Sequence, residues 1–296
     1  MGHVLITGAS GLIGSALAKR LALRRDVLCM SRRPVQVEAP CVRGDFARFE
    51  DLRQLDGYSI EAVVHLAAVT GGCSEADAMA VNVEGTRCLM RYLIDRGCRR
   101  FVLASSIAVV GMQAEDFKPV QVPIPDEHPC LDRHGYGLSK YLMEELSRYY
   151  ARQNPAIDVI NLRLCSVHPD QGAPSLHPMG PQTAWAFGKL AQMGVTDACR
   201  ALEAALAAPP APAEGVAGVA GVAGAAGVRI MNAAPQQAWA EVDVASLLRS
   251  WYGDELDVNY YEQPGQERAS LFDVRRIERE LGFAADVRQA MTAGRE

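Results

Sequence analysis

The chain has 296 residues, of which 49% are hydrophobic and 22% charged, with a formal net charge of −5. No basic surface dominates, which argues against nucleic-acid binding, and no apolar run approaches the roughly 20 residues that span a bilayer. The amino terminus starts in a strand-like run without the features of a signal peptide. The eight cysteines are scattered without metal-like spacing, so we expect no metal site and a reduced, cytoplasmic location.

Short apolar runs alternate with helix-like segments through the first half of the chain. The expected strands are residues 3–7, 26–30, 40–44, 62–68, 100–106 and 158–164, and the expected helices are residues 15–25, 49–55, 78–97 and 136–153. Nearly continuous apolar strands separated by helices are typical of a parallel sheet covered on both faces. The succession predicts an α/β fold with a doubly wound parallel sheet, the Rossmann fold.

The pattern loosens in the second half. After a loop rich in Pro, Gly and His, the expected elements are a helix at 196–208, an ordered run at 228–233, a helix at 241–253, a strand at 256–261 and a helix at 273–283. The low-complexity stretch at about 208–227 has little to bury, and we expect a flexible surface insertion. We divide the chain into a dinucleotide-binding domain, residues 1–164, and a small substrate-binding subdomain, residues 165–296, parts of which return to the Rossmann sheet.

Residues 7–14, TGASGLIG, place glycines at 8, 11 and 14 between the first strand and the first helix. Such glycines permit a tight turn and let the backbone approach a pyrophosphate at a helix N-terminus. Because the motif follows a strand and opens a helix, it predicts a dinucleotide site.

The end of the second expected strand predicts which dinucleotide binds. NAD sites normally have an acidic residue there for the adenosine ribose, whereas this chain has Ser31, Arg32 and Arg33. Arginine binds a 2′-phosphate that an acid would repel. We therefore favour NADP over NAD, and two solvated loop arginines are the alternative interpretation.

Tyr136 precedes Lys140 by four residues at the expected start of a helix, so the two side chains share a face. A neighbouring ammonium lowers the pKa of a phenol, which makes the pair a candidate for proton exchange near neutral pH. An accidental pair on a surface helix is the alternative. Ser106 ends the fifth strand, and strand ends meet at the carboxyl edge of such a sheet. We expect Ser106, Tyr136 and Lys140 to converge over a nicotinamide.

Together these motifs resemble the extended short-chain dehydrogenase/reductases, specifically the NAD-dependent epimerase/dehydratase family of sugar-modifying enzymes. The resemblance is specific over about residues 3–164 and weak beyond. It implies that Tyr136 is the acid/base, that Lys140 binds the nicotinamide ribose, and that Ser106 hydrogen-bonds the reacting oxygen. The cofactor-binding residues that it implies are Gly8, Ser10, Gly11, Leu12, Ile13, Gly14, Ser31, Arg32, Arg33, Asp45, Phe46, Leu66, Ala67, Ala68, Asn82, Tyr136 and Lys140.

Some of these assignments follow the family's alignment closely. The family's S-x-x-V-Y-G aligns with residues 106–111, which selects Ser106 rather than Ser105. Asp45 is expected at the adenine, and Asn82 is expected to support the active-site water and backbone.

Departures from the family pattern reduce the range of activities that we expect for this chain. Val110 replaces a tyrosine that commonly contacts substrate. Ile107 and Ala108 replace the Asp-Glu pair of 4,6-dehydratases, so sugar dehydration of that kind is not expected.

The loop after the sixth strand also departs from the pattern. Residues 166–170, SVHPD, replace the N-V-Y-G-P that helps sugar-nucleotide enzymes hold the diphosphate. Ser166, His168 and Arg268 are candidate substrate contacts, with Arg268 replacing part of the diphosphate grip. His168 or His177 is a candidate second acid/base, although such loop histidines more often serve only as hydrogen-bonding residues.

The leading hypothesis is an NAD(P)-dependent epimerase or oxidoreductase that transfers hydride at a hydroxyl or keto carbon of a sugar-like substrate, either free or nucleotide-linked. The alternatives are an NADPH-dependent ketoreductase and a uronate-type sugar dehydrogenase, the latter suggested by residues 163–169. A non-catalytic NADP sensor is disfavoured because Tyr136 and Lys140 are both present. The resemblance also implies a homodimer through the helices around residues 82–96 and 136–153.

Overall fold

The computed structural model describes residues 2–171, 175–211 and 227–285, and a parallel sheet forms its centre. Within these ranges the sheet has seven strands in the order β3-β2-β1-β4-β5-β6-β9, all paired in parallel. Its strands are β1 (His3–Thr7), β2 (Val27–Ser31), β3 (Cys41–Arg43), β4 (Ile60–His65), β5 (Arg100–Ser106), β6 (Asp158–Leu164) and β9 (Val228–Ala233). A separate pair contains β7 (Ser166–His168) and β8 (Gln192–Gly194).

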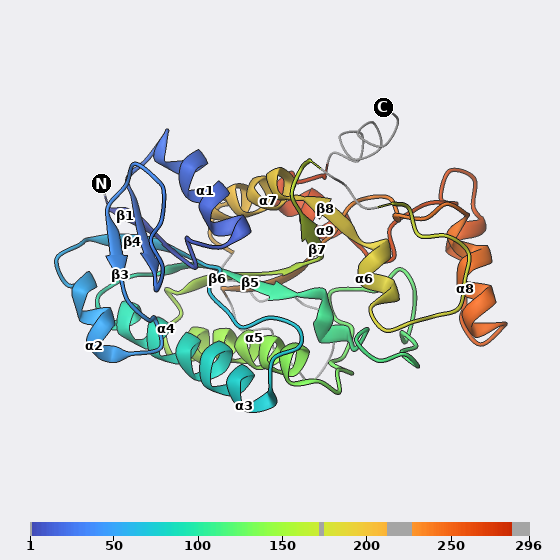
Figure 1. Ribbon diagram of the computed structural model, residues 1–296, viewed down its shortest axis with the longest axis horizontal. Coiled ribbons are helices and arrows are strands. Elements are labelled where there is room, and N and C mark those ends of the chain that lie inside the picture. The colour runs from blue at the N-terminus through green and yellow to red at the C-terminus, as the bar shows by residue number, and fades with distance from the viewer. Residues whose placement is uncertain (1, 172–174, 212–226, 286–296) are drawn as a thin grey trace.

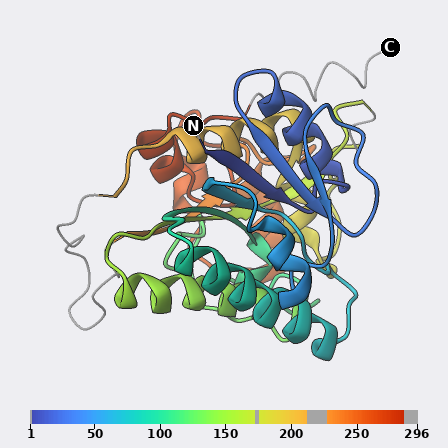
Figure 2. The same cartoon turned by 90° about the vertical axis from the view of Figure 1, so that its left-hand side faces the viewer.

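Helices cover both faces of the sheet, with α1 and α7 on one face and α4 and α5 on the other (Figures 1 and 2). The α-helices are α1 (Leu12–Ala22), α2 (Phe49–Leu52), α3 (Glu75–Asp77), α4 (Thr86–Asp95), α5 (Gly135–Gln153), α6 (Ala186–Leu190), α7 (Val195–Ala207), α8 (Val244–Tyr252) and α9 (Arg275–Leu281). Shorter turns are the 3-10 helices η1 (Arg53–Leu55), η3 (Ile107–Val110) and η4 (Asn259–Glu262), and the π-helical segment η2 (Ala78–Gly85).

The two-sided cover explains the apolar strands. Every residue of β2 and β6 is buried, and so are the last four residues of β1, because helices pack on both faces. The expected Rossmann fold is confirmed. Among the described helices, none has the length and apolar character needed to cross a membrane.

The C-terminal part returns to the Rossmann sheet. The expected run at residues 228–233 is β9, which pairs with β6 from Val159↔Val228 to Leu164↔Ala233. Helix α7 packs beside α1. Strand β9 and helix α7 therefore complete the Rossmann sheet and its helical cover, although both follow residue 164. That residues 165–296 form a substrate-binding subdomain stays a prediction.

One expected element is wrong and another lies partly outside the described residues. Residues 256–261 do not form a strand: the chain turns into η4 after the Asp257 carboxylate accepts a hydrogen bond from the Asn259 amide, at 3.0 Å. Such side-chain bonds to nearby backbone compete with strand pairing. The expected insertion at about 208–227 falls mostly within residues 212–226, which the structure does not describe.

Candidate active site

The glycine loop between β1 and α1 is closed by backbone contacts that leave no room for a side chain at Gly8 or Gly14. Gly8 has φ +70°, and a Cβ there would lie 2.7 Å from the Ala67 amide nitrogen. A Cβ on Gly14 would lie 2.2 Å from the Gly8 carbonyl oxygen. The loop thus brings the start of α1 against the end of β4, and the exposed N-terminus of α1 fits the pyrophosphate of a dinucleotide.

A hollow follows this loop along the carboxyl edge of β1, β2 and β4. It is lined by Gly8, Ser10, Gly11, Met30, Ser31, Arg32, Arg33, Gly44, Phe46, Leu66, Ala67, Ala68 and Val81. Ten of these residues were predicted from the sequence to bind cofactor, and Met30, Gly44 and Val81 were not. Leu12, Ile13, Gly14, Asp45, Asn82, Tyr136 and Lys140 were predicted but do not line this hollow.

At the end of β2, the Ser31 hydroxyl donates to the Ser10 hydroxyl at 2.7 Å, which links β2 to the glycine loop. The Arg32 guanidinium is largely exposed, at 69% of its side chain, and lies 3.8 Å from the Asp45 carboxylate. Asp45 is itself fixed because its carboxylate accepts from the Ala47 amide at 3.0 Å. An exposed arginine with one distant partner is free to pair with an added phosphate.

A buried polar network joins β1, β4 and the π-helical segment η2. The His65 ring lies between the Thr7 hydroxyl, 2.6 Å away, and the Thr86 hydroxyl, 3.0 Å away. Burial, with the charge of Lys140 as the smaller cause, lowers the pKa of His65 to about 3. The ring is therefore neutral and fixed in orientation, and Thr7 also accepts from the Ala67 amide. His65 falls within the expected strand at residues 62–68, and no role was predicted for it.

Asn82 ties the loop after β4 to α5. Its amide exchanges two hydrogen bonds of 2.9 Å with the backbone of Val69 and donates to the Ser139 hydroxyl at 3.0 Å. It is buried in η2, and π-helical segments are frequent at functional sites. This geometry agrees with the predicted support of active-site backbone.

The structure distinguishes the two serines at the end of β5. The Ser105 hydroxyl is buried and donates to the Glu144 carboxylate at 2.6 Å. The Ser106 hydroxyl accepts from the Ala108 amide at 3.1 Å and lies near enough to the Tyr136 side chain to offset part of the rise that burial causes in its pKa. Only Ser106 of the two meets the tyrosine, as the alignment suggested.

Tyr136 and Lys140 both lie near the start of α5, as the spacing predicted. The Lys140 ammonium lies 5.8 Å from the centre of the Tyr136 ring and donates to the Ala104 carbonyl at 2.7 Å. Burial lowers the pKa of Lys140 to about 8, while the Glu144 carboxylate opposes this shift.

The expected lowering of the Tyr136 pKa by Lys140 is wrong for this structure. Burial raises the pKa of Tyr136, and the Ser106 hydroxyl partly offsets that rise. Desolvation of a phenolate outweighs a single hydrogen bond because the charged form loses its water.

The residues predicted to contact substrate differ in their hydrogen-bond partners and do not all lie in one hollow. The Arg268 guanidinium donates to the carbonyls of Ala240 and Glu241 at 2.7 and 2.6 Å, so it holds a loop together. His168 contacts the Pro169 carbonyl through Nδ1, and its Nε2 is buried without a partner among the described residues. Ser166 lies on β7, and its backbone amide donates a hydrogen bond to the Ala191 carbonyl. His177 lines a separate hollow with Lys189 and Gln192.

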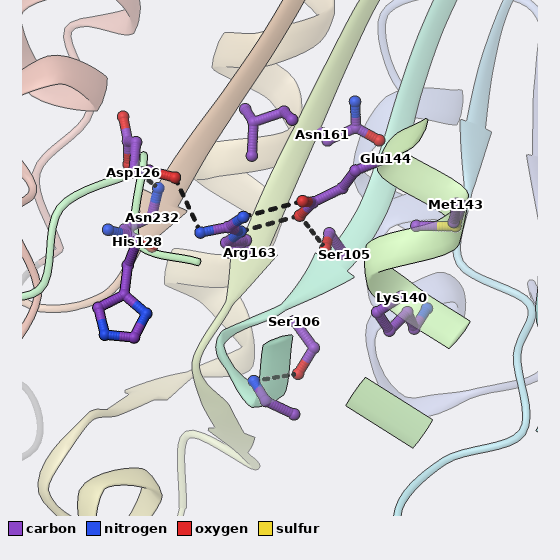
Figure 3. Close-up of polar contacts among 12 residues, drawn as sticks. Ser105, Ser106, Asp126, His128, Lys140, Met143, Glu144, Asn161, Arg163 and Asn232 are labelled. Carbon is purple, nitrogen blue, oxygen red and sulfur yellow. Dashed lines mark hydrogen bonds and ion pairs between the residues drawn. The ribbon is translucent and has the colours of Figure 1, made fainter. Parts of the chain in front are cut away.

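A buried ion pair beneath the serines was also missed by the sequence analysis. Arg163 on β6 and Glu144 on α5 form two parallel hydrogen bonds of 2.9 Å (Figure 3). The position of Glu144, four residues after Lys140, was the available signal. Among the described residues, no cluster of His, Cys, Asp or Glu is arranged to hold a metal ion.

A Rossmann sheet with this glycine loop, and with serine, tyrosine and lysine at its carboxyl edge, defines the class of extended short-chain dehydrogenase/reductases. The sequence model of the NAD dependent epimerase/dehydratase family matches residues 4–180, more than half of the chain. The chain belongs to this family.

Known relatives include both dehydrogenases and epimerases. The chain is 33% identical to D-erythronate dehydrogenase from Cupriavidus necator over 194 residues, 58% of this chain and 57% of that protein. It is 30% identical to UDP-glucose 4-epimerase from Erwinia amylovora over 180 residues, 54% of this chain and 52% of that protein. The matched region thus spans little more than half the length of these relatives.

The fold likeness is more extensive. A short-chain dehydrogenase/reductase superfamily protein from Agrobacterium tumefaciens, solved with bound NAD, superimposes with a TM-score of 0.70 at 23% identity. The superposition covers 98% of this chain and 95% of that one. At this level of identity the match establishes a common fold.

Proposed function

We propose that the protein is an NAD(P)-dependent oxidoreductase that transfers hydride at a hydroxyl-bearing or keto carbon of a sugar-like substrate. The observation that carries this proposal is the convergence of Ser106, at the end of β5, with Tyr136, whose burial-raised pKa the Ser106 hydroxyl partly lowers, while the Lys140 ammonium lies on the same face of α5. Two hydroxyls that meet at the carboxyl edge of a Rossmann sheet are positioned to hold and deprotonate one substrate hydroxyl.

The proton chemistry follows from these three side chains. In the oxidising direction, Tyr136 as phenolate takes the proton of the substrate hydroxyl, while Ser106 donates a hydrogen bond to the same oxygen. Lys140, which the Ala104 carbonyl holds in place, would bind the nicotinamide ribose, as the family resemblance implies. The nicotinamide cofactor, when bound, supplies the hydride acceptor. In the reducing direction Tyr136 returns the proton to the oxygen of the keto group.

We propose NADP as the preferred cofactor. Support comes from Ser31, which occupies the position of the ribose-binding acid, and from the exposed Arg32 and the adjacent Arg33 in the hollow. The nearby Asp45 carboxylate, 3.8 Å from Arg32, lowers the positive potential of this region. We therefore expect a preference for NADP with measurable binding of NAD.

We propose an unactivated sugar-like substrate, such as a sugar acid, rather than a nucleotide-linked sugar. Arg268 was the candidate for gripping a diphosphate, and its guanidinium is instead bonded to two backbone carbonyls. The similarity to D-erythronate dehydrogenase supports the same choice. The second candidate is a nucleotide-sugar 4-epimerase, which the similarity to UDP-glucose 4-epimerase favours.

The first experiment is to denature the purified protein and identify any released nucleotide by mass spectrometry. Stoichiometric retained dinucleotide supports the epimerase, because an epimerase recycles its own hydride. An empty protein that reduces NADP⁺ or NAD⁺ with a sugar acid, followed by nicotinamide absorbance, supports the dehydrogenase. Tyr136→Phe should abolish turnover and retain cofactor binding. Absence of binding to either dinucleotide would refute the proposal, and binding without turnover of any substrate would favour the non-catalytic sensor.

We also propose a cytoplasmic homodimer with α4 and α5 at the interface. The two helices pack side by side on one face of the sheet (Figure 2), and Tyr149 on α5 is 46% exposed. Light scattering at several protein concentrations tests the dimer, and a monomer at all of them would refute it.

A further inference from the structure

One face of α5 contacts three successive residues at the end of β5. Tyr136, Lys140 and Glu144 are spaced by four residues and so share that face. Tyr136 meets Ser106, the Lys140 ammonium donates to the Ala104 carbonyl at 2.7 Å, and the Glu144 carboxylate accepts from the Ser105 hydroxyl at 2.6 Å. Glu144 is therefore the third member of a row whose first two members are the proposed catalytic side chains.

The Glu144 carboxylate is completely buried and held at both oxygens. Arg163, with 3% of its side chain exposed, donates through Nε to one oxygen and through a terminal nitrogen to the other, each at 2.9 Å (Figure 3). Another terminal nitrogen of Arg163 donates to the Asp126 carbonyl at 2.9 Å. Replacing a buried ion pair by apolar residues is often neutral or stabilising, so stability alone does not explain this arrangement at the catalytic edge.

The charges around Lys140 are few. Within its own helix, Glu144 is the acid that favours the charged ammonium, and the Tyr136 ring lies 5.8 Å away. From β4, His65 faces Lys140 as a neutral ring. From β6, Arg163 contributes a positive charge that is paired with Glu144. The acids of α3, which packs on α5, are exposed to solvent. Among these groups, Glu144 is thus the buried negative charge that favours the protonated form of Lys140.

We propose that Glu144 is a positioning residue that keeps the Lys140 ammonium protonated and holds the end of β5 so that Ser106 faces Tyr136. Its catalytic consequence rests on the proposed function. The effect of Glu144 on the charge of Lys140 is independent of the proposed function, because that charge can be measured without substrate, cofactor or turnover.

The chain has four lysines, Lys19, Lys118, Lys140 and Lys189, so NMR of protein labelled with ¹³C-lysine gives few signals to separate. The Lys140 signal is assigned as the one missing in Lys140→Met. In the wild-type protein its midpoint should lie well below the ordinary lysine value of 10.5, because burial lowers the pKa of Lys140 to about 8. In Glu144→Gln its midpoint should fall by about one further pH unit, since a charge about 5–6 Å away at Cβ is lost and Arg163 loses its counter-charge.

The matched control is Glu145→Gln. Glu145 is the next residue of α5, is 38% exposed and pairs with Arg148, so its removal should leave the Lys140 midpoint unchanged. An unchanged midpoint in Glu144→Gln, or an equal shift in both variants, would overturn the proposal. If Glu144→Gln does not fold, the double variant Glu144→Leu with Arg163→Met removes the pair without leaving a buried charge. Its Lys140 midpoint should also fall, by less than in Glu144→Gln because the positive charge of Arg163 is removed as well, and an unchanged midpoint would again overturn the proposal.

Turnover gives the second measurement. Because activity requires a protonated Lys140, the alkaline fall of kcat/KM should move to lower pH in Glu144→Gln by the same interval as the NMR midpoint. A smaller kcat with an unmoved pH profile would mean a purely structural role and would overturn the proposal. If no substrate is turned over, the proposed function fails while the NMR titration still decides the role of Glu144.

Discussion

Glycines of the same loop should respond differently to one added methyl group. A Cβ on Gly14 would lie 2.2 Å from the Gly8 carbonyl oxygen and 2.9 Å from the Ala9 Cα. A Cβ on Gly11 would approach the same carbonyl oxygen only to 3.3 Å, and Gly11 has an ordinary extended backbone with φ −83°. We therefore expect Gly14→Ala to affect folding and Gly11→Ala to affect the dinucleotide.

The expected magnitudes follow from these distances. Gly14→Ala requires the loop or α1 to move by about 1 Å, and overpacking of this kind costs about 1–3 kcal/mol or more. In a protein of this size that corresponds to a fall in Tm of about 2 °C per kcal/mol. Gly11→Ala should change stability by less than about 1 kcal/mol, since few atoms must shift. Its methyl group would enter the hollow where we place the pyrophosphate and should weaken dinucleotide binding at least about tenfold, or 1.4 kcal/mol.

Chemical denaturation of the purified variants without cofactor measures the first effect. Titration with NADPH and NADH, followed by fluorescence, measures the loss of dinucleotide affinity. It is carried out on folded wild-type and Gly11→Ala protein. A Gly14→Ala protein as stable as the wild type would refute the steric account of the loop. A Gly11→Ala protein with unchanged affinity for both dinucleotides would place the cofactor elsewhere.

Three further predictions concern the acid/base, the cofactor and the pH dependence of stability. Tyr136→Phe should lower kcat by about 10²–10⁴-fold, because it removes the proton acceptor, while the Kd for cofactor changes little; a kcat within threefold of wild type would exclude Tyr136 as the acid/base. Ser31→Asp should shift the ratio of NADPH to NADH affinity toward NADH, because the new carboxylate repels a 2′-phosphate and accepts from a ribose hydroxyl, and competitive titration measures that ratio. Burial raises the pKa of Asp126 to about 7 from 3.8, so this group adds stability as pH falls through 7, whereas His65, with a pKa lowered to about 3 from 6.5, removes stability as pH falls below 6.5. Asp126→Asn should therefore lose more stability than the wild type between pH 7 and pH 5 in denaturant titrations, and equal losses would contradict this.

Features fixed by neighbouring residues could be predicted from the sequence. The turn from β1 into α1 depends on glycines within a few residues of each other, and the pairing of Tyr136 with Lys140 depends on helix geometry alone. The apolar strands were visible because burial on both faces requires continuous apolar runs. The family membership rests on the same local motifs.

Failures arose where local signals conflict or contacts are distant. Leu256 and Val258 are buried and alternate with the polar residues Asp257 and Asn259, which suited a strand, but the Asp257 carboxylate accepts from the Asn259 amide and the backbone turns. The bonds of Arg268 to the carbonyls of Ala240 and Glu241, 28 and 27 residues away, could not be foreseen because such distant contacts leave no trace in the sequence, and its role at the substrate stays a prediction.

The prediction that the pKa of Tyr136 is lowered failed for a different reason. Its direction depends on how deeply the finished fold desolvates the hydroxyl, and the spacing of a lysine carries no information about that burial.

The packing of one helix on one strand sets the geometry of the proposed chemistry. Ala104, Ser105 and Ser106 of β5 are met by Lys140, Glu144 and Tyr136 of α5, through a carbonyl, a buried hydroxyl and the candidate catalytic hydroxyl.

These contacts lie within the Rossmann part and do not involve the C-terminal segments that contain Ser166 and His168 of β7 and Arg268. Substitutions in those segments should therefore change KM and substrate choice while leaving the Lys140 titration intact. Substitutions along the α5–β5 contact should change the pH profile for every substrate. Comparing the two sets of variants on one substrate panel would separate the machinery of proton transfer from that of recognition.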